Sequence, residues 1–438
     1  MWDLLSEVQQ RFPSTEGTSF LSFRSKSLFF TCWSVGLGGL STVFGDPGYS
    51  QRAIASDTTA VFAGYIMGGI CWFIVPWALG SSIGLASRAL LTNPNFVTYP
   101  NELSSFETNA GMPLIYALNT IFGKSGAAAG LVMIFMSVTS ATSAELIAFS
   151  SIFSYDIYKN YINSKSTGEQ IVKVAHWSVV FFTLLSSGLA VVFNYVGVST
   201  GWIISFYGII LGPEVSALVL SLYWKKFSTI AIVGGCILGT ISGIVCWIGG
   251  TYHWSGGLVN KDTLMIPEAT FVGNIASIFS SLIYFIIISA LKPADFNFDI
   301  FMNSFEAGDD ALEREIEAMH IDEKQRKSLR NRSYASILLN AFFLIGVAVV
   351  LPLSFYAAKS AFSKRFFTLW IAFMMAWLLI AASYLVIMPL WQGRFEIILC
   401  MKQFIRGQSQ SIVDEDNSTH DKGRNEKLSD IEINISNI

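Results

Sequence analysis

The sequence predicts an all-α fold, a polytopic bundle of helices that cross a lipid bilayer. Apolar residues make up 52% of the 438 positions and charged residues only 13%, whereas a soluble domain carries about 25% charged residues. Uncharged runs close to or above the length of about 20 residues that spans a bilayer recur along the chain. The charges fall between these runs and in the C-terminal tail, and they sum to a formal net charge of −3.

Nine apolar runs are the predicted spans, and their ends divide the chain into segments. The predicted spans are 28–44, 58–87, 127–153, 172–195, 200–223, 229–248, 271–291, 334–355 and 366–390. The expected segments are a polar extracellular segment at 1–27, a core of membrane helices at 28–223, two additional membrane helices at 224–291, a charged cytoplasmic helix at 292–333, two C-terminal membrane helices at 334–391 and a disordered cytoplasmic tail at 392–438.

The first span is short, carries Gly36, Gly38 and Gly39, and ends at Asp46 and a proline. We expect the helix to be broken near these glycines, because membrane segments interrupted by Gly or Pro expose free backbone amides and carbonyls at transporter binding sites. The alternative is an unbroken helix whose glycines allow close packing against a neighbour. On the first interpretation, the three glycines and Asp46 are candidate substrate-binding residues.

The central span, 127–153, is polar for a membrane helix, and a short apolar helix at 113–122 is expected before it. Glu145 is the only ionisable side chain of the span, and a carboxylate inside a membrane is costly and usually functional. Hydroxyls in such a helix either face a water-filled site or bond carbonyls of their own helix. The candidates for ion or proton coupling in this span are Ser137, Ser140, Thr142, Ser143 and Glu145.

A second intramembrane carboxylate, Glu214, follows a proline in the fifth span. Proline removes a backbone hydrogen bond and frees a carbonyl one turn earlier. Glu214 is therefore a further candidate for coupling, with the alternative that its carboxylate reaches the membrane interface. In the sixth span, Gly235, Gly239 and Gly243 predict a ridge of small residues for close helix packing.

Residues 309–332 have the pattern of a charged helix, acidic first and basic last, an order that suits the helix dipole. We expect a solvated surface helix, with a regulatory docking element as the alternative. Lys and Arg in short loops gather on the side of this segment, which is cytoplasmic by the positive-inside rule, although the basic loop 356–365 departs from it. The C-terminus is then cytoplasmic, 101–107 is outside, and the plasma membrane is the expected location.

Enzymatic motifs are absent: the sequence has no Gly-x-Ser-x-Gly elbow, no His-Glu-x-x-His pair and no P-loop. The four histidines are scattered, and the five cysteines lie in or next to apolar runs, a pattern that implies no disulfide framework. We therefore expect a non-enzyme with no cofactor or metal. The expected partners are the lipid bilayer and a small molecule, and not nucleic acid.

Two stretches carry a family resemblance. Residues 44–56 are Phe-Gly-Asp-Pro-Gly-Tyr-Ser-Gln-Arg-Ala-Ile-Ala-Ser, and residues 135–158 begin Phe-Met-Ser-Val-Thr-Ser-Ala-Thr-Ser-Ala-Glu and end Ser-Tyr-Asp-Ile-Tyr. Both resemble the urea active transporters of fungi and plants, a branch of the sodium:solute symporter family. The resemblance covers roughly residues 20–290. It implies a partial five-plus-five inverted-repeat core, in which the first span is the discontinuous first helix of the second repeat and the central span is its third helix.

The resemblance also implies a position for the cation of the family, at the carbonyl of Ser137 and at Ser140 and Ala141. Sodium-coupled members carry a hydroxyl residue at the last of these positions, and Ala141 has none. A co-transported proton is therefore favoured over sodium. Glu145 lies one helical turn from Ala141 and is the expected proton carrier, with Glu214 as the alternative.

The first repeat of the family should precede residue 28, where this sequence has only a short polar segment. We therefore expect a C-terminal portion of a transporter, with a missing N-terminal half as a partner. The function implied by the resemblance is proton-coupled transport of urea, and polyamines or related small amides are not distinguished from it. The alternative is a non-transporting remnant or a sensor-like membrane protein derived from such a transporter.

Overall fold

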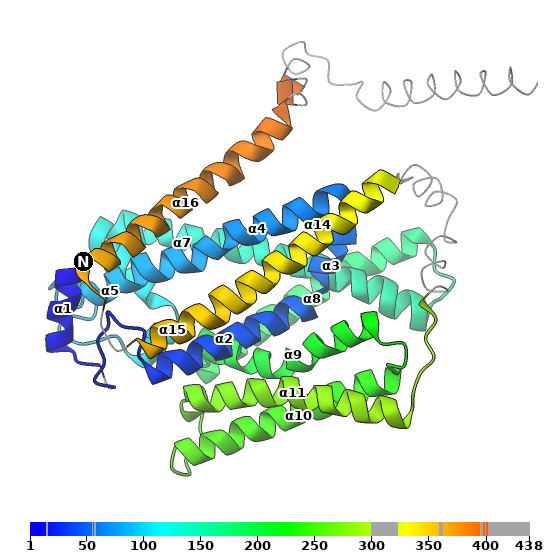
Figure 1. Ribbon diagram of the computed structural model, residues 1–438, viewed down its shortest axis with the longest axis horizontal. Helices are drawn as coiled ribbons and strands as arrows, with labels where there is room; N and C mark the ends of the chain where they lie inside the picture. The colour runs from blue at the N-terminus through cyan, green and yellow to red at the C-terminus, as the bar shows by residue number, and fades with distance from the viewer. Residues whose placement is uncertain are drawn as a thin grey trace, which may run out of the picture. The chain divides into compact units, whose positions relative to one another are not determined.

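The computed structural model describes residues 1–298, 323–358 and 362–401, apart from positions 15, 55, 57, 395, 396 and 399. Every regular element in these residues is a helix (Figure 1), and nine helical stretches are long and apolar enough to cross a membrane. The chain forms two compact units, Met1–Ala372 and Phe373–Ile438. The prediction of an all-α, polytopic membrane protein is confirmed for the described residues.

The predicted spans fall within the observed helical stretches, some of which extend well beyond them or consist of several consecutive elements. In chain order the elements are α1 (Trp2–Arg11), α2 (Lys26–Gly45), α3 (Pro47–Ile54), α4 (Thr58–Leu79), the π-helix η1 (Gly80–Gly84), α5 (Leu85–Ala89), α6 (Ser105–Asn109), α7 (Met112–Ser151), the π-helix η2 (Ile152–Ile162), α8 (Gly168–Val196), α9 (Thr200–Tyr223), α10 (Thr229–Trp254), the 3₁₀ turn η3 (Thr263–Met265), α11 (Pro267–Leu291), α14 (Glu323–Phe342), the π-helix η4 (Phe343–Val350), α15 (Leu351–Ala357) and α16 (Lys364–Gln392).

Helices α2, α9, α10 and α11 form the most closely packed group in the first unit. α10 meets α11 along the predicted glycine ridge, where Gly235 lies against an aromatic ring of α11. A Cβ atom added at Gly239 would lie 2.5 Å from the Cβ atom of Ser281, and one added at Gly243 would lie 2.6 Å from the Cβ atom of Ser277. Larger residues would separate the two helices, so the prediction of a small-residue ridge is confirmed.

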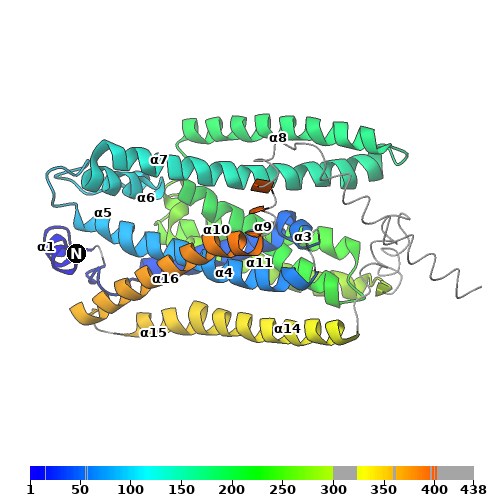
Figure 2. The same ribbon diagram turned by 90° about the horizontal axis from the view of Figure 1, so that it is seen from above.

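Helix α7 contains a chain reversal. Gly123 has φ 65° and ψ −157°, a backbone conformation that is open almost only to glycine. The residues on its two sides pack together, since a Cβ atom added at Gly126 would lie 2.5 Å from the carbonyl oxygen of Leu118. The expected short helix 113–122 is the first arm of this hairpin, and the central span is the second arm. Figure 2 shows the second arm running beside α8.

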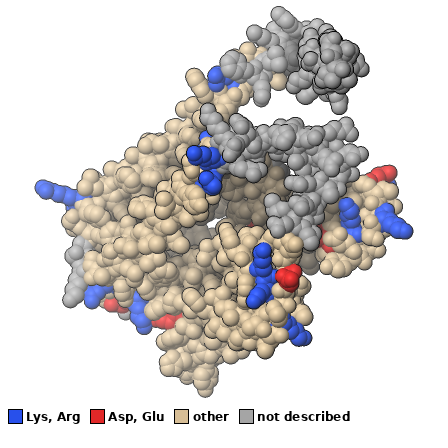
Figure 3. All heavy atoms as spheres, turned by 45° about the vertical axis from the view of Figure 1, so that its right-hand side comes forward, with Lys and Arg blue, Asp and Glu red and all other residues tan. Residues whose placement is uncertain are grey.

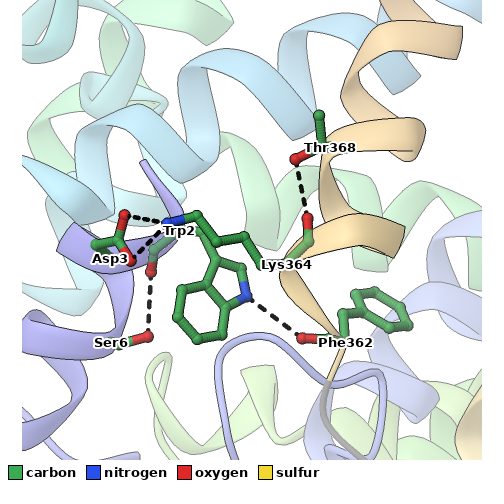
Figure 4. A network of polar contacts seen from close by, with 6 residues as sticks. All are labelled: Trp2, Asp3, Ser6, Phe362, Lys364 and Thr368. Carbon is green, nitrogen blue, oxygen red and sulfur yellow. Dashed lines mark hydrogen bonds and ion pairs between the residues drawn. The ribbon is translucent and has the colours of Figure 1, made fainter.

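The N-terminal segment contains the short helix α1, which the sequence did not predict. Leu5 is fully buried, and Asp3 forms an ion pair with Lys364 at the start of α16, with 2.8 Å between Oδ2 and Nζ (Figure 4). Trp2 Nε1 donates a hydrogen bond of 3.3 Å to the carbonyl oxygen of Phe362. The hydrogen bond from the Lys364 ammonium holds the pKa of the Asp3 carboxyl below its usual range. The start of the chain and the residues that precede α16 therefore lie at the same end of the first unit.

Most of the charged segment expected at 309–332 lies outside the described residues, as does the tail beyond residue 401. The described part of the segment belongs to α14, which continues without a break past residue 334 into the candidate span Arg330–Ala357. Figure 3 shows one face of the molecule that is mostly uncharged, with charged side chains in a few small groups. Such a surface suits a helix bundle that faces lipid.

Candidate functional site

The helix break lies at Asp46, between α2 and α3. Asp46 has the extended backbone angles φ −87° and ψ 106°, and α3 begins at Pro47. The Oδ1 atom of Asp46 accepts a hydrogen bond of 2.7 Å from the backbone N–H of Gly48. Asp46 is thus the N-terminal cap of α3, and Pro47 occupies the first helical position, where proline is well tolerated.

The expected break near Gly36, Gly38 and Gly39 is wrong, because α2 is continuous from Lys26 to Gly45. A glycine weakens a helix by about 1 kcal/mol but keeps its N–H, whereas Pro47 has none, and the hydrogen-bond ladder therefore ends at the proline. The alternative, close packing, holds for Gly38: a Cβ atom added to it would lie 3.5 Å from the Cα atom of Gly208 in α9. A Cβ atom at Gly36 or Gly39 would meet no described atom within 4 Å.

Glu214 of α9 lies at the end of α2. Its carboxylate occupies the space beside Gly45 where any larger residue would place its Cβ atom. Glu214 is half-buried and follows Pro213, which is buried. The side chain therefore faces the end of α2.

Glu145 approaches the same break from α7. Helices α7 and α3 meet one turn beyond Glu145, where a Cβ atom added at Gly48 of α3 would lie 3.7 Å from the Cβ atom of Ala148. Glu145 lies within electrostatic range of Asp46 and of the Arg52 guanidinium in α3. No described residue donates a hydrogen bond to its carboxylate. The break therefore has a carboxylate from α7, one from α9, the capping aspartate and one guanidinium around it.

The hydroxyl groups of α7 are not assembled into a site by the described residues. Ser137 donates a hydrogen bond of 2.9 Å to the carbonyl oxygen of Met133 in its own helix, as the structural interpretation expects. Ser140, Ala141, Thr142 and Ser143 are exposed, as is Ser137. Within the described part of the chain, no other helix covers the face on which the resemblance places the cation of the family.

Comparison with known proteins identifies the family. The sodium:solute symporter family matches residues 6–243, more than half of the chain. This chain is a member of the sodium:solute symporter family. No solved structure matches this chain significantly.

Its relatives include transporters whose names specify urea. The chain is 51% identical over 409 residues to "Probable urea active transporter 2" of Schizosaccharomyces pombe, covering 93% of this chain and 60% of that protein. It is 33% identical to "Urea active transporter" of Saccharomyces cerevisiae, covering 95% and 65%. It is 32% identical to "Urea-proton symporter DUR3" of Oryza sativa subsp. japonica, covering 81% and 47%. This chain thus spans about three-fifths of the length of the probable urea active transporters of Schizosaccharomyces pombe that it matches.

Two residues at the break were not predicted as part of the site. Arg52 is the cation of the short helix α3, and Gly45 is the position against which the Glu214 carboxylate packs. The sequence does carry a signal for Arg52, because this charged residue lies in a short segment between two apolar runs. The sequence holds no comparable signal for Gly45, because its role depends on which face of α9 is turned toward α2.

Proposed function

We propose that this symporter carries urea across the membrane by secondary active transport and that the co-transported ion is a proton. The observation that carries the proposal is the convergence of Glu145 and Glu214 on the break between α2 and α3. Support comes from the relatives named as urea active transporters and as a urea-proton symporter. Intramembrane carboxylates beside broken helices are groups that transporters use for substrate and proton handling.

A driving ion is required because urea is neutral and the membrane potential alone does not concentrate it. A proton that enters with urea contributes about 2.3 kcal/mol per 100 mV of membrane potential and about 1.4 kcal/mol per pH unit. For 100 mV and one pH unit, these energies sustain a urea gradient of several hundred-fold, on the order of 500. One coupled proton is therefore enough for accumulation from dilute urea.

The helix break supplies hydrogen-bonding groups that suit urea. Because Pro47 has no N–H, the carbonyl of Val43 at the end of α2 lacks its helical partner and is an acceptor for a urea N–H. The first turn of α3 presents N–H groups that are donors for the urea oxygen. Asp46 holds this geometry by capping α3. In this proposal the substrate site is at Asp46, and Gly36, Gly38 and Gly39 do not contribute an unwound backbone.

Glu145 is the proposed proton carrier, and Glu214 is the second candidate. Ala141 places no side-chain oxygen one turn from Glu145, where a sodium ion would need a ligand. Asp46 caps α3 and so has a structural role. Glu145 and Glu214 are the carboxylates at the break that have no such role. A carboxyl group that is alternately exposed to the two sides of the membrane binds a proton on the more acidic side and releases it on the other.

The exposed hydroxyl face of α7 requires a cover in a working transporter. The relatives are longer than this chain. We propose that a segment corresponding to their additional length packs against Ser137, Ser140 and Ala141. This segment belongs to the same protein or to a second chain. We also propose the plasma membrane as the location, with the C-terminus in the cytoplasm, from the distribution of Lys and Arg among the loops.

The proposal is tested by urea uptake. The full-length transporter that carries these residues is produced in cells without urea transport of their own, and entry of radiolabelled urea is measured at several external pH values. Uptake is expected to rise as the external pH falls and to be unchanged when sodium is replaced by choline. Uptake that needs sodium refutes proton coupling, and an absence of urea uptake from a surface-localised protein refutes the proposed substrate.

A further inference from the structure

A polar cavity lies away from the helix break, where α2, α9 and α11 begin. It has a volume of about 710 Å³ and is lined by residues of these three helices, of α6 and of the loop between α10 and α11. We call it the α2–α9–α11 pocket. Ser34 and Thr270 in its wall are 5% and 3% exposed, so the polar lining extends into the packed core. Its size is typical of small-molecule sites.

Three hydroxyl groups of this pocket have already used their hydrogens, those of Thr31, Ser205 and Thr270. Thr31 donates to the carbonyl oxygen of Ser27 at 2.9 Å, and Ser205 donates to that of Gly201 at 3.1 Å. Thr270 donates to the carbonyl oxygen of Pro267 at 3.0 Å, and its oxygen lies 3.2 Å from the Ser34 hydroxyl, which is then the donor to it. Each hydroxyl oxygen retains lone pairs that can accept a further hydrogen bond. The α2–α9–α11 pocket therefore presents acceptors from three helices to whatever enters it.

Donors stand at one side of the same pocket. The ammonium group of Lys261 contacts the carbonyl oxygen of Val196 at 3.3 Å and has two further hydrogens. Asn109 at the end of α6 lies beside Gly201, and its side-chain amide carries two N–H donors in addition to the Oδ1 acceptor. Acceptors that outnumber the donors suit a ligand that has several N–H groups and one carbonyl oxygen.

The α2–α9–α11 pocket is separate from the helix break. Ser34 precedes Asp46 by 12 residues of the same chain, which is about 18 Å of helix. One turn beyond Ser34 the helices close: Gly38 meets Gly208, and a Cβ atom added at Gly208 would lie 2.5 Å from the Oδ1 atom of the fully buried Asn274. A tight crossing of three helices thus separates a ligand in this pocket from Glu145 and Glu214.

We propose that the α2–α9–α11 pocket is a binding site for urea or a related small amide, in addition to the site at the helix break. The proposal rests on the proposed urea function and deepens it, because the pocket is a place where substrate is held before it passes the crossing of α2, α9 and α11. Ligand recognition there depends on N–H donors of the ligand, and the acceptors are the oxygens of Thr31, Ser205 and Thr270.

Equilibrium binding of radiolabelled urea to the purified 438-residue chain in lipid nanodiscs tests the proposal. The double variant Thr31→Val with Ser205→Ala removes two acceptors and is expected to weaken binding at this pocket about fivefold for each, or roughly 25-fold together, while the site at the helix break keeps its affinity. Thr31→Ser retains the oxygen and is expected to bind like the parent chain. Thr183→Val is the matched control, because Thr183 of α8 also donates to its own helix, at 2.8 Å to Val179, and does not line the pocket.

Competing ligands provide a second readout. Acetamide, which has N–H donors, is expected to displace urea from the parent chain, whereas tetramethylurea, which has none, is expected to leave it bound. Binding to the double variant that equals binding to the Thr183→Val control overturns the pocket as a site, as does a parent chain that binds no urea.

The two proposals fail in different experiments. If the double variant binds urea like the parent chain while the full-length transporter still accumulates urea, the pocket is wrong and the transport function stands. If binding depends on Thr31 and Ser205 but the transporter shows no proton-driven accumulation, the pocket stands and proton coupling is wrong.

Discussion

Glu214 and Gly45 show how single residues define the site. The Glu214 carboxylate fills the space that the absent side chain of Gly45 leaves at the end of α2. Glu145 comes from a different helix and lies within electrostatic range of Asp46 and Arg52. Both glutamates were predicted as candidates because a carboxylate in an apolar run is conspicuous. Their convergence on the α2–α3 break was not predictable from spacing, because it depends on how α7 and α9 are rotated about their axes.

Glu145→Gln is expected to abolish pH-driven accumulation of urea in the full-length transporter. Glutamine keeps the size and hydrogen-bonding capacity of the side chain but does not titrate, so downhill urea exchange is expected to remain. Accumulation and counterflow of radiolabelled urea measure the two activities. Glu169→Gln is the control, because Glu169 pairs with Lys173 at 2.7 Å on the exposed start of α8. Unchanged accumulation in Glu145→Gln would assign the proton to Glu214, with Glu214→Gln as the next variant.

At the scale of elements, the α7 hairpin and the α2–α3 break have different sequence signals. A short apolar helix before the central span was expected, and the chain reverses at Gly123 between the two. The break was expected among three glycines but lies at Pro47. Glycine lowers helix propensity only slightly, and tertiary packing of Gly38 against Gly208 keeps α2 intact. Packing does not compensate for the backbone N–H that Pro47 lacks, so the helical hydrogen bonds end there.

Gly123→Ala is expected to destabilise the protein by about 1–3 kcal/mol, because a residue with a Cβ atom is strained at φ 65° and ψ −157°. The thermal unfolding midpoint of the purified chain in detergent measures the effect. The control is Gly188→Ala in α8, where an added Cβ atom meets nothing within 4 Å and helix propensity favours alanine by up to about 1 kcal/mol. Equal midpoints for the two variants would contradict the hairpin geometry.

At the scale of the first unit, helix directions relate the loops to the two sides of the membrane. The α2–α9–α11 pocket joins the starts of three helices and α6, so these lie at one end. Helix α8 ends just before Gly197, which lines this pocket. The loop before α8 therefore lies about 44 Å away, because α8 is 29 residues long. The spans were predictable because hydropathy alone marks them. The pocket was not, because it joins residues from four separate stretches of the chain.

Cysteine labelling tests the orientation of the first unit in intact cells. Asn101→Cys is expected to react with a membrane-impermeant maleimide, and Ser164→Cys is expected to react only after the cells are permeabilised. Both positions are exposed, and labelling is compared with that of the parent protein, which has five cysteines of its own. The reverse pattern would place the C-terminus outside.

Proton movement with urea tests the central claim most directly. The full-length transporter is reconstituted into liposomes that contain a pH-sensitive dye, the membrane potential is clamped, and urea is added outside without sodium. The account predicts that the interior acidifies as urea enters and that the signal disappears in Glu145→Gln. Urea entry without acidification, or acidification that requires sodium, would contradict it.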